Sequence, residues 1–171
     1  MCIIIAKPQG AKLPPYKILE NCARRNPDGF GFATVNGCYH FMNFDTFCRC
    51  LEEAAEDRQS LLIHFRWATH GSIGLTNCHP FRDDVTGVSF AHNGILNIKP
   101  YKDMTDSETA FRGLYVPKIR RYGLDSDELA YEVYQTIGYS RFAFLGQDSQ
   151  IRCFGPFYEF GGCKYSNANF M

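Results

Sequence analysis

The chain has 171 residues, of which 45% are hydrophobic and 15% aromatic, so it can bury one sizeable core and we expect a single domain over residues 1–171. Its 18 lysines and arginines balance 18 aspartates and glutamates, and this zero net charge disfavours nucleic acid, an anionic membrane surface or an acidic protein as a partner. The apolar run at the N-terminus ends at Lys7 and Pro8, too early for a signal peptide or a membrane span, so we expect a cytoplasmic protein with free cysteines.

The first part of the chain predicts strands separated by two helices. Residues 2–6 are apolar and mostly β-branched, as expected of a buried strand. The dipeptide Asn36-Gly37 tolerates positive φ and predicts a tight hairpin turn. Phe47 and Leu51 lie four residues apart and predict the apolar face of a helix. In chain order we expect a strand at 2–6, a helix at 16–25, strands at 30–35 and 39–44, a helix at 45–57 and a strand at 61–67.

The second part of the chain predicts a loop, two helices and further strands. Thr105 and Glu108 have the spacing of a capping box, in which each side chain satisfies a free amide of the other, and they predict the start of a helix. Strands, then paired helices, then strands again indicate an α+β sandwich. In chain order we expect a loop at 71–80, a strand at 88–91, helices at 105–122 and 127–137, and strands at 142–145 and 151–154.

Cys2 is the first candidate for chemistry. The initiator Met1 is removed when the second side chain is small, and its removal would make Cys2 the first residue. An N-terminal cysteine carries a thiol with a pKa of about 8.5 and an α-amine with a pKa of about 7.7 to 8.0, so it holds its own general base. Taken alone, a buried strand cysteine is the commoner explanation of the same residue.

Three further positions are candidates for binding or catalysis, and each has a structural alternative. Arg66, at the end of an apolar strand, offers a planar fork to a ligand carboxylate or forms a structural salt bridge. Asn93 followed by Gly94 can aim two N–H donors at one point, as an oxyanion needs, or can simply form a turn. Asp106, at the start of a helix, can hold an ammonium group or stabilise the helix N-terminus.

Six short motifs occur in order along the chain. They are Met-Cys at 1–2 followed by III, NPDGFG at 26–31, RWATHG at 66–71, NCHP at 77–80, HNG at 92–94 and DSE at 106–108. Together they resemble the class II glutamine amidotransferases, the N-terminal nucleophile glutaminase domains of asparagine synthetase and of the amidophosphoribosyl and glucosamine-phosphate synthases. The tail, including KYSN at 164–167, is similar to small stand-alone members of the family, some of phage type.

The resemblance implies a role for each candidate residue. Cys2 attacks the γ-carboxamide of glutamine, with its own α-amine as the base. Asn93, through its side-chain amide, and Gly94, through its backbone N–H, hold the oxyanion. Arg66 binds the α-carboxylate of the substrate and Asp106 its α-ammonium. The resemblance also places Trp67, Thr69 and His70 at the substrate and His79 behind them, as a support of the substrate loop. A structural histidine with satisfied hydrogen bonds is the commoner explanation of His79.

The family fold implied is a four-layer αββα sandwich of two antiparallel sheets flanked by helices. No cofactor is expected, and because the eight cysteines include no C-x-x-C pair we expect no metal site. The expected partners are L-glutamine and a separate synthase that accepts the ammonia. Two alternatives remain open at this point: an N-terminal nucleophile hydrolase acting on another amide, and a binding module on the same fold without catalysis. The segment between Asn93 and Asp106 is shorter than in the large synthases.

Overall fold

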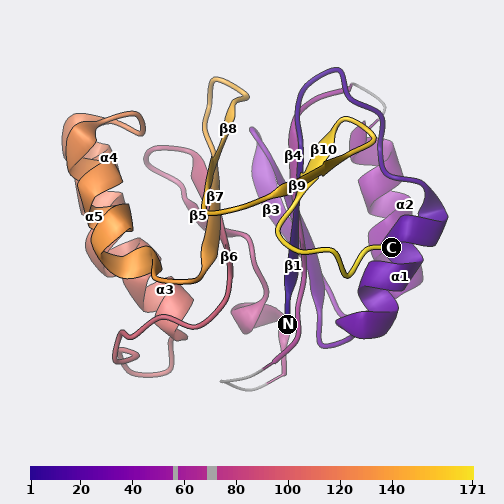
Figure 1. Cartoon of the computed structure of the whole chain (residues 1–171), viewed down its shortest axis with the longest axis horizontal. Coiled ribbons are helices and arrows are strands. Elements are labelled where there is room, and N and C mark those ends of the chain that lie inside the picture. The colour runs from indigo at the N-terminus through magenta and orange to yellow at the C-terminus, as the bar shows by residue number, and fades with distance from the viewer. Residues whose placement is uncertain (56–57, 69–72) are drawn as a thin grey trace.

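The molecule has four layers, with two antiparallel sheets packed face to face and helices on both outer sides (Figure 1). The computed structural model describes residues 1–55, 58–68 and 73–171. Every strand pair in it is antiparallel. The αββα sandwich implied by the resemblance is therefore confirmed. In the part of the chain described, no helix is long and apolar enough to cross a membrane.

The first sheet has six strands, with β1 near its middle. Ile4 of β1 pairs with His64 of β4 on one side, and Ile5 pairs with Tyr165 of β10 on the other. Helices α1 (Tyr16–Arg25) and α2 (Phe44–Ala55) cover the outer face of this sheet (Figure 1). The strand order is β3 (Gly37–Phe41), β2 (Phe30–Thr34), β4 (Leu61–Phe65), β1 (Ile3–Lys7), β10 (Cys163–Tyr165) and β9 (Tyr158–Phe160).

The second sheet has four strands and is covered by the remaining helices (Figure 1). Its order is β5 (Phe81–Asp83), β6 (Val88–Asn93), β7 (Arg141–Leu145) and β8 (Ile151–Phe154). The helices on its outer face are α3 (Asp106–Ala110), a π-helical turn (Phe111–Tyr115), α4 (Val116–Tyr122) and α5 (Asp127–Ile137). A 3₁₀ turn, Leu75–Asn77, precedes β5.

The apolar core is divided into three clusters, one at each junction between layers. Ile3 and Ile5 of β1 pack in the cluster that also holds the α1 and α2 side chains, whereas Ile4 packs between the two sheets. A third cluster, around Phe90 and Phe111, lies between the second sheet and its helices. Because β1 is apolar on both of its faces, it can lie at the centre of the sandwich.

Two local predictions near helix ends need correction. The capping box at 105–108 is only half formed: the Thr105 hydroxyl accepts the Glu108 N–H at 3.1 Å, but the Glu108 carboxylate instead accepts the Arg112 side chain at 2.7 Å. The helix predicted at 105–122 forms as three consecutive segments with the π-helical turn in the middle. The helix predicted at 45–57 is α2, and residues 56 and 57 lie outside the described residues.

The hairpin formed by β2 and β3 turns one residue earlier than predicted. Thr34 pairs with Gly37, so Gly37 is already the first residue of β3, and neither Asn36 nor Gly37 has a positive φ. This register places Phe32 opposite Tyr39, with ring centroids 5.0 Å apart. Cross-strand aromatic packing therefore sets the register here in place of the turn dipeptide. The short strands β5, β9 and β10 were not predicted at all.

Candidate active site

The side chain of Cys2 lies just before β1, beside the chain segment that leaves the end of β4. The backbone N–H of Trp67 donates to the Cys2 sulfur at 3.2 Å, and the Trp67 carbonyl lies 3.4 Å from the same sulfur. Cys2 is partly exposed as a residue, and Trp67 is 46% exposed. The first residue of the candidate mechanism is therefore held at the edge of the sandwich, where a ligand can reach it.

A turn at 26–29 holds the segment that follows β4. The Asp28 N–H donates to the Arg66 carbonyl at 3.0 Å, and the Arg66 N–H donates to the Gly29 carbonyl at 2.8 Å. The Asp28 carboxylate accepts the Ala68 N–H at 2.8 Å. These bonds replace sheet pairing, and for this reason β4 ends at Phe65 and not at residue 67 as predicted. The NPDG motif thus shapes the backbone that contacts the Cys2 sulfur.

Gly31, the last residue of the NPDGFG motif, is required by a close approach of two backbones. A Cβ atom added there would lie 2.2 Å from the His79 carbonyl oxygen and 2.9 Å from the His40 ring. We expect Gly31→Ala to lower the free energy of unfolding by about 1 to 3 kcal/mol, because the backbones at Gly31 and His79 must move apart to admit the methyl group. Chemical denaturation measures the change.

Gly113→Ala is the matched control for Gly31→Ala. A Cβ atom at Gly113, inside the helical region 106–122, meets nothing within 4 Å. That substitution is expected to leave the stability unchanged or to raise it by up to about 1 kcal/mol, because alanine is the better helix former. Equal stabilities of the two variants would contradict the close approach at Gly31.

Asn93 ends strand β6, Gly94 follows it, and both line a cavity that Cys2 also lines. The Asn93 side chain is 1% exposed and its Nδ2 donates to the Ser166 hydroxyl at 2.9 Å. Gly94 has φ +144°, and a Cβ atom there would lie 2.2 Å from the Ser140 hydroxyl oxygen. Glycine is therefore needed at this point both for its backbone angle and for space.

Asp106 lies at the start of α3 and holds the loop that follows β6. One carboxylate oxygen accepts the Leu96 N–H at 2.8 Å, and the other accepts the Ser107 N–H at 2.8 Å. The Ser107 hydroxyl also lies 3.2 Å from the carboxylate oxygen that accepts the Ser107 N–H. A carboxylate has about four acceptor positions, so these three contacts leave room for one bond from a ligand ammonium. The short segment between Asn93 and Asp106 is spanned by the Leu96 contact, which brings the carboxylate back towards the end of β6.

Two cavities border Cys2, and Cys2, Trp67 and Gly94 line both of them. The wider cavity has a volume of about 620 Å³ and is also lined by Asn93. The narrow one, of about 40 Å³, is lined by the buried Arg66 together with Asp106, Asn77, His79 and His92, among others. The structure therefore brings the described candidate residues to one place, with a cation and an anion on the narrow side.

Burial keeps the thiol and two of the histidines at the site in their neutral forms. Burial raises the pKa of the Cys2 thiol, an effect partly offset by the Trp67 N–H and the nearby positive charges of the N-terminus and Arg66. Burial also lowers the pKa of His64 to about 3 and that of His92 to about 4. At neutral pH both rings are uncharged, and the thiol needs a base to lose its proton.

His79 is buried as predicted, but its surroundings differ from the prediction. Its ring lies 4.5 Å from the ring of His64 and 4.5 Å from that of Phe81, and burial lowers its pKa well below the usual value. Neither ring nitrogen has a hydrogen-bond partner among residues 1–55, 58–68 and 73–171. The expected hydrogen-bonded histidine is thus wrong for that part of the chain, because aromatic rings surround it. Thr69 and His70 lie outside the described residues.

Two residues of the C-terminal tail at the site were not identified as site residues from the sequence. The Asn167 side chain donates to the Cys2 carbonyl at 2.7 Å, and the Ser166 hydroxyl contacts Asn93 as described above. The KYSN motif at 164–167 contains both of them, and it was the only signal in the sequence that pointed to this segment.

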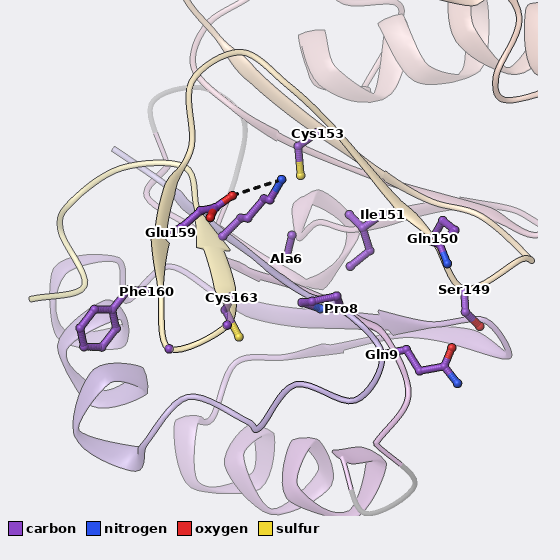
Figure 2. A pocket seen from close by; sticks show the side chains of 13 residues that line it. Ala6, Pro8, Gln9, Ser149, Gln150, Ile151, Cys153, Glu159, Phe160 and Cys163 are labelled. Atoms are coloured by element: carbon purple, nitrogen blue, oxygen red, sulfur yellow. Dashed lines mark ion pairs between the residues drawn. The ribbon is translucent and has the colours of Figure 1, made fainter.

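A second large cavity, of about 470 Å³, lies at the opposite end of β1 (Figure 2). Its walls include Cys153 and Cys163, which Figure 2 labels together with Glu159. Lys164 also lines this cavity and pairs with Glu159 at 3.5 Å. Burial raises the pKa of each of these two thiols to about 11, so neither is a nucleophile at neutral pH. Cys2 does not line this cavity.

Comparison with known proteins identifies relatives of one kind. A family model described as class-II glutamine amidotransferases matches residues 46–137. A glutamine–fructose-6-phosphate aminotransferase (isomerizing) of Chlamydia abortus is 34% identical in an alignment 110 residues long that covers 58% of this chain and 18% of that protein. A putative glutamine amidotransferase of Haemophilus influenzae is 32% identical in an alignment 88 residues long that covers 46% of this chain and 29% of the relative.

The fold is also found among solved structures. The glutamine phosphoribosylpyrophosphate amidotransferase of B. subtilis superimposes with a TM-score of 0.63 over 96% of this chain and 41% of that one, at 16% sequence identity. At this identity the likeness concerns the fold. The matched segments span less than a third of the two curated relatives, 18% and 29% of their lengths.

Proposed function

Since the chain belongs to the class-II glutamine amidotransferases, we propose that it hydrolyses L-glutamine to glutamate and ammonia through a thioester on Cys2. The observation that carries this proposal is the position of Cys2. It lines two cavities together with Gly94, and Arg66 and Asp106 line the narrow one. The proposal treats residues 1–171 as one glutaminase domain.

The proposed reaction begins once Met1 has been removed. The Cys2 sulfur attacks the γ-carbonyl carbon of glutamine, and the freed α-amine takes the thiol proton. The negative charge moves to the carbonyl oxygen, where the Asn93 side-chain amide and the Gly94 N–H stabilise it. The carbon–nitrogen bond then breaks, and the same amine returns its proton to the departing ammonia. Water hydrolyses the thioester, which releases glutamate and regenerates the thiol.

The internal amine is needed because of the environment of the thiol. Burial raises the pKa of Cys2, so little thiolate forms spontaneously at neutral pH. An amine on the same residue, with a pKa of about 7.7 to 8.0 when free, is well matched to accept that proton. The Trp67 N–H, 3.2 Å from the sulfur, supports the proposal by stabilising charge as it develops there.

Substrate selection is proposed to depend on two opposite charges in the narrow cavity. Arg66 binds the α-carboxylate of glutamine and Asp106 binds its α-ammonium, while Trp67 borders both cavities. A glutamine within a peptide lacks both charges, so a free amino acid is preferred. We also place Thr69 and His70 at the substrate in this proposal, on the family resemblance alone.

The ammonia is proposed to pass to a separate acceptor enzyme. The alignment with the Chlamydia abortus aminotransferase covers 18% of that protein. The rest of its length has no counterpart in the alignment. We propose that the protein acts in the cytoplasm, whose reducing conditions keep Cys2 a thiol. All eight cysteines lie in the described ranges, and each is a free thiol.

Arg66→Lys tests the substrate assignment. Wild type is expected to release glutamate from L-glutamine and to use the α-methyl ester of glutamine about 10- to 100-fold less efficiently, because the ester lacks the charge-assisted bond to the guanidinium. The variant is expected to lose most of this preference, since lysine lacks the planar fork. Values of kcat/KM for both substrates, with thermal unfolding to confirm the fold, provide the measurement. An unchanged preference would remove Arg66 from the site.

A further inference from the structure

The C-terminal tail is part of the candidate site, although it lies outside the residues 46–137 that match the family model. Strand β10 pairs with β1, and the pairing continues past its end, because the Ser166 N–H donates to the Ile4 carbonyl at 3.0 Å. In return the Ile4 N–H donates to the Ser166 hydroxyl at 2.8 Å. Asn167 then binds the Cys2 carbonyl at 2.7 Å. The tail thus holds the first residues of the chain in place.

The hydroxyl of Ser166 also binds the amide of Asn93. The Asn93 Nδ2 donates to the Ser166 oxygen at 2.9 Å, and both side chains are buried, with exposed fractions of 1% and 0%. The Asn93 Oδ1 is buried without a hydrogen-bond partner among the described residues. One serine oxygen therefore joins the strand that carries the nucleophile to the amide proposed to hold the oxyanion.

A count of donors and acceptors shows how this contact is completed. A serine hydroxyl has one hydrogen to donate and two lone pairs to accept with. The N–H groups of Ile4 and Asn93 occupy both lone pairs of the Ser166 oxygen. The Ser166 hydroxyl hydrogen has no acceptor in the described part of the chain. A 180° rotation of the Asn93 amide meets both needs, since Oδ1 then accepts the Ser166 hydrogen. The rotation also frees both Nδ2 hydrogens from Ser166. Because buried donors without a partner cost free energy, these hydrogens then need another acceptor.

We propose that Ser166 is a positioning residue, which donates its hydroxyl proton to Asn93 Oδ1 and so directs the Asn93 Nδ2 hydrogens to the oxyanion. Ser166 itself does not touch the substrate. The Ile4 N–H fixes the serine oxygen, and the serine fixes the amide. This inference rests on the proposed glutaminase function for its kinetic consequences, whereas the contact between Ser166 and Asn93 stands apart from that function.

Steady-state kinetics of Ser166→Ala provide the first test. We expect kcat for glutamine hydrolysis to fall about 10- to 100-fold, because the amide loses its orientation, while KM changes less than about two-fold. Ser166→Cys, which keeps a weak donor of similar size, is expected to fall between wild type and Ser166→Ala. Lys164→Ala is the control on the same strand: its side chain is 51% exposed and pairs with Glu159 at the surface, so kcat should not change.

A double-mutant cycle separates positioning from a general loss of stability. Asn93→Ala is expected to lower kcat by about 100- to 1,000-fold, the usual effect of losing one oxyanion donor. If Ser166 acts through Asn93, adding Ser166→Ala to Asn93→Ala lowers kcat by less than about two-fold further. Full additivity of the two effects, or a normal kcat in Ser166→Ala, would overturn the proposal.

Nuclear magnetic resonance tests the contact without any assay. The Asn93 side-chain amide signals, assigned by their loss in Asn93→Ala, are expected to shift or broaden in Ser166→Ala and to stay in place in Lys164→Ala. Unshifted signals in Ser166→Ala would overturn the proposal. If the wild type released no glutamate, the proposed function would fail, and these signals alone would then decide whether Ser166 orients Asn93.

Discussion

Replacing Cys2 with alanine is expected to lower kcat for glutamine hydrolysis by about 10⁴- to 10⁶-fold, the size of effect seen when a covalent nucleophile is removed. The reason is that, among the described residues that line the two cavities, Cys2 carries the only thiol that could form the acyl intermediate. Glutamate release, measured beside the wild type at saturating glutamine, gives the change.

Two further variants make the Cys2 result specific. Cys50→Ala, which removes a partly buried thiol from α2, is expected to keep the wild-type rate. Cys2→Ser puts a hydroxyl nucleophile in place of the thiol, beside the α-amine, and should retain more activity than Cys2→Ala. Equal glutamate release by Cys2→Ala and wild type would eliminate the mechanism.

A glutamate inserted between Met1 and Cys2 is expected to lower kcat by about 10²- to 10⁴-fold, although the thiol is still present. The insertion prevents removal of Met1, so the α-amine no longer belongs to Cys2 and the sulfur loses its base. The initial rate of glutamate release is the measurement, and the mass of the purified protein verifies the blocked N-terminus.

The matched control for that insertion is an extension that a protease can remove to leave Cys2 as the first residue. Activity is expected to be low before cleavage and to return to the wild-type level after it. A blocked protein that hydrolyses glutamine at the normal rate would show that the α-amine is not the base.

The α+β class could be predicted from the residues because the longer strands carry their burial pattern locally, whereas the four layers followed from the family resemblance. Ile3, Ile4 and Ile5 are apolar in succession, and the structure packs them alternately towards the helices and between the sheets. Such a run indicates a strand buried on both faces without any knowledge of its neighbours. The motif NPDG was likewise visible, although its function in holding residues 66–68 became clear only from its hydrogen bonds.

The contacts that support the site could not be predicted, because they join residues far apart in the sequence. Ser166 is 73 residues from Asn93 and 162 residues from Ile4. A serine followed by an asparagine reads as a loop in any local pattern. The strand β10 that places them is only three residues long. Similarly, the register of the β2–β3 hairpin depends on Phe32 and Tyr39 meeting across strands, which the dipeptide Asn36-Gly37 does not reveal.

The candidate residues of the site lie at the ends of strands, where the fold can bring them together. Cys2 precedes β1, Arg66 follows β4 and Asn93 ends β6, so strands from both sheets converge on one edge of the sandwich. Neighbouring antiparallel strands bring such ends together only where the register allows it, and Ile3 opposite Phe65 is the pair that does so here. The rigid core thus fixes the distances between groups that the sequence keeps far apart.

The most direct test of the central claim is the mass of the N-terminal peptide after the protein is mixed with excess glutamine and quenched in acid. If Cys2 forms the thioester, the peptide begins at Cys2 and carries one γ-glutamyl group. Hydroxylamine cleaves the thioester and removes that group. A peptide that begins at Met1, or one without the added group in a preparation that does release glutamate, would contradict this claim.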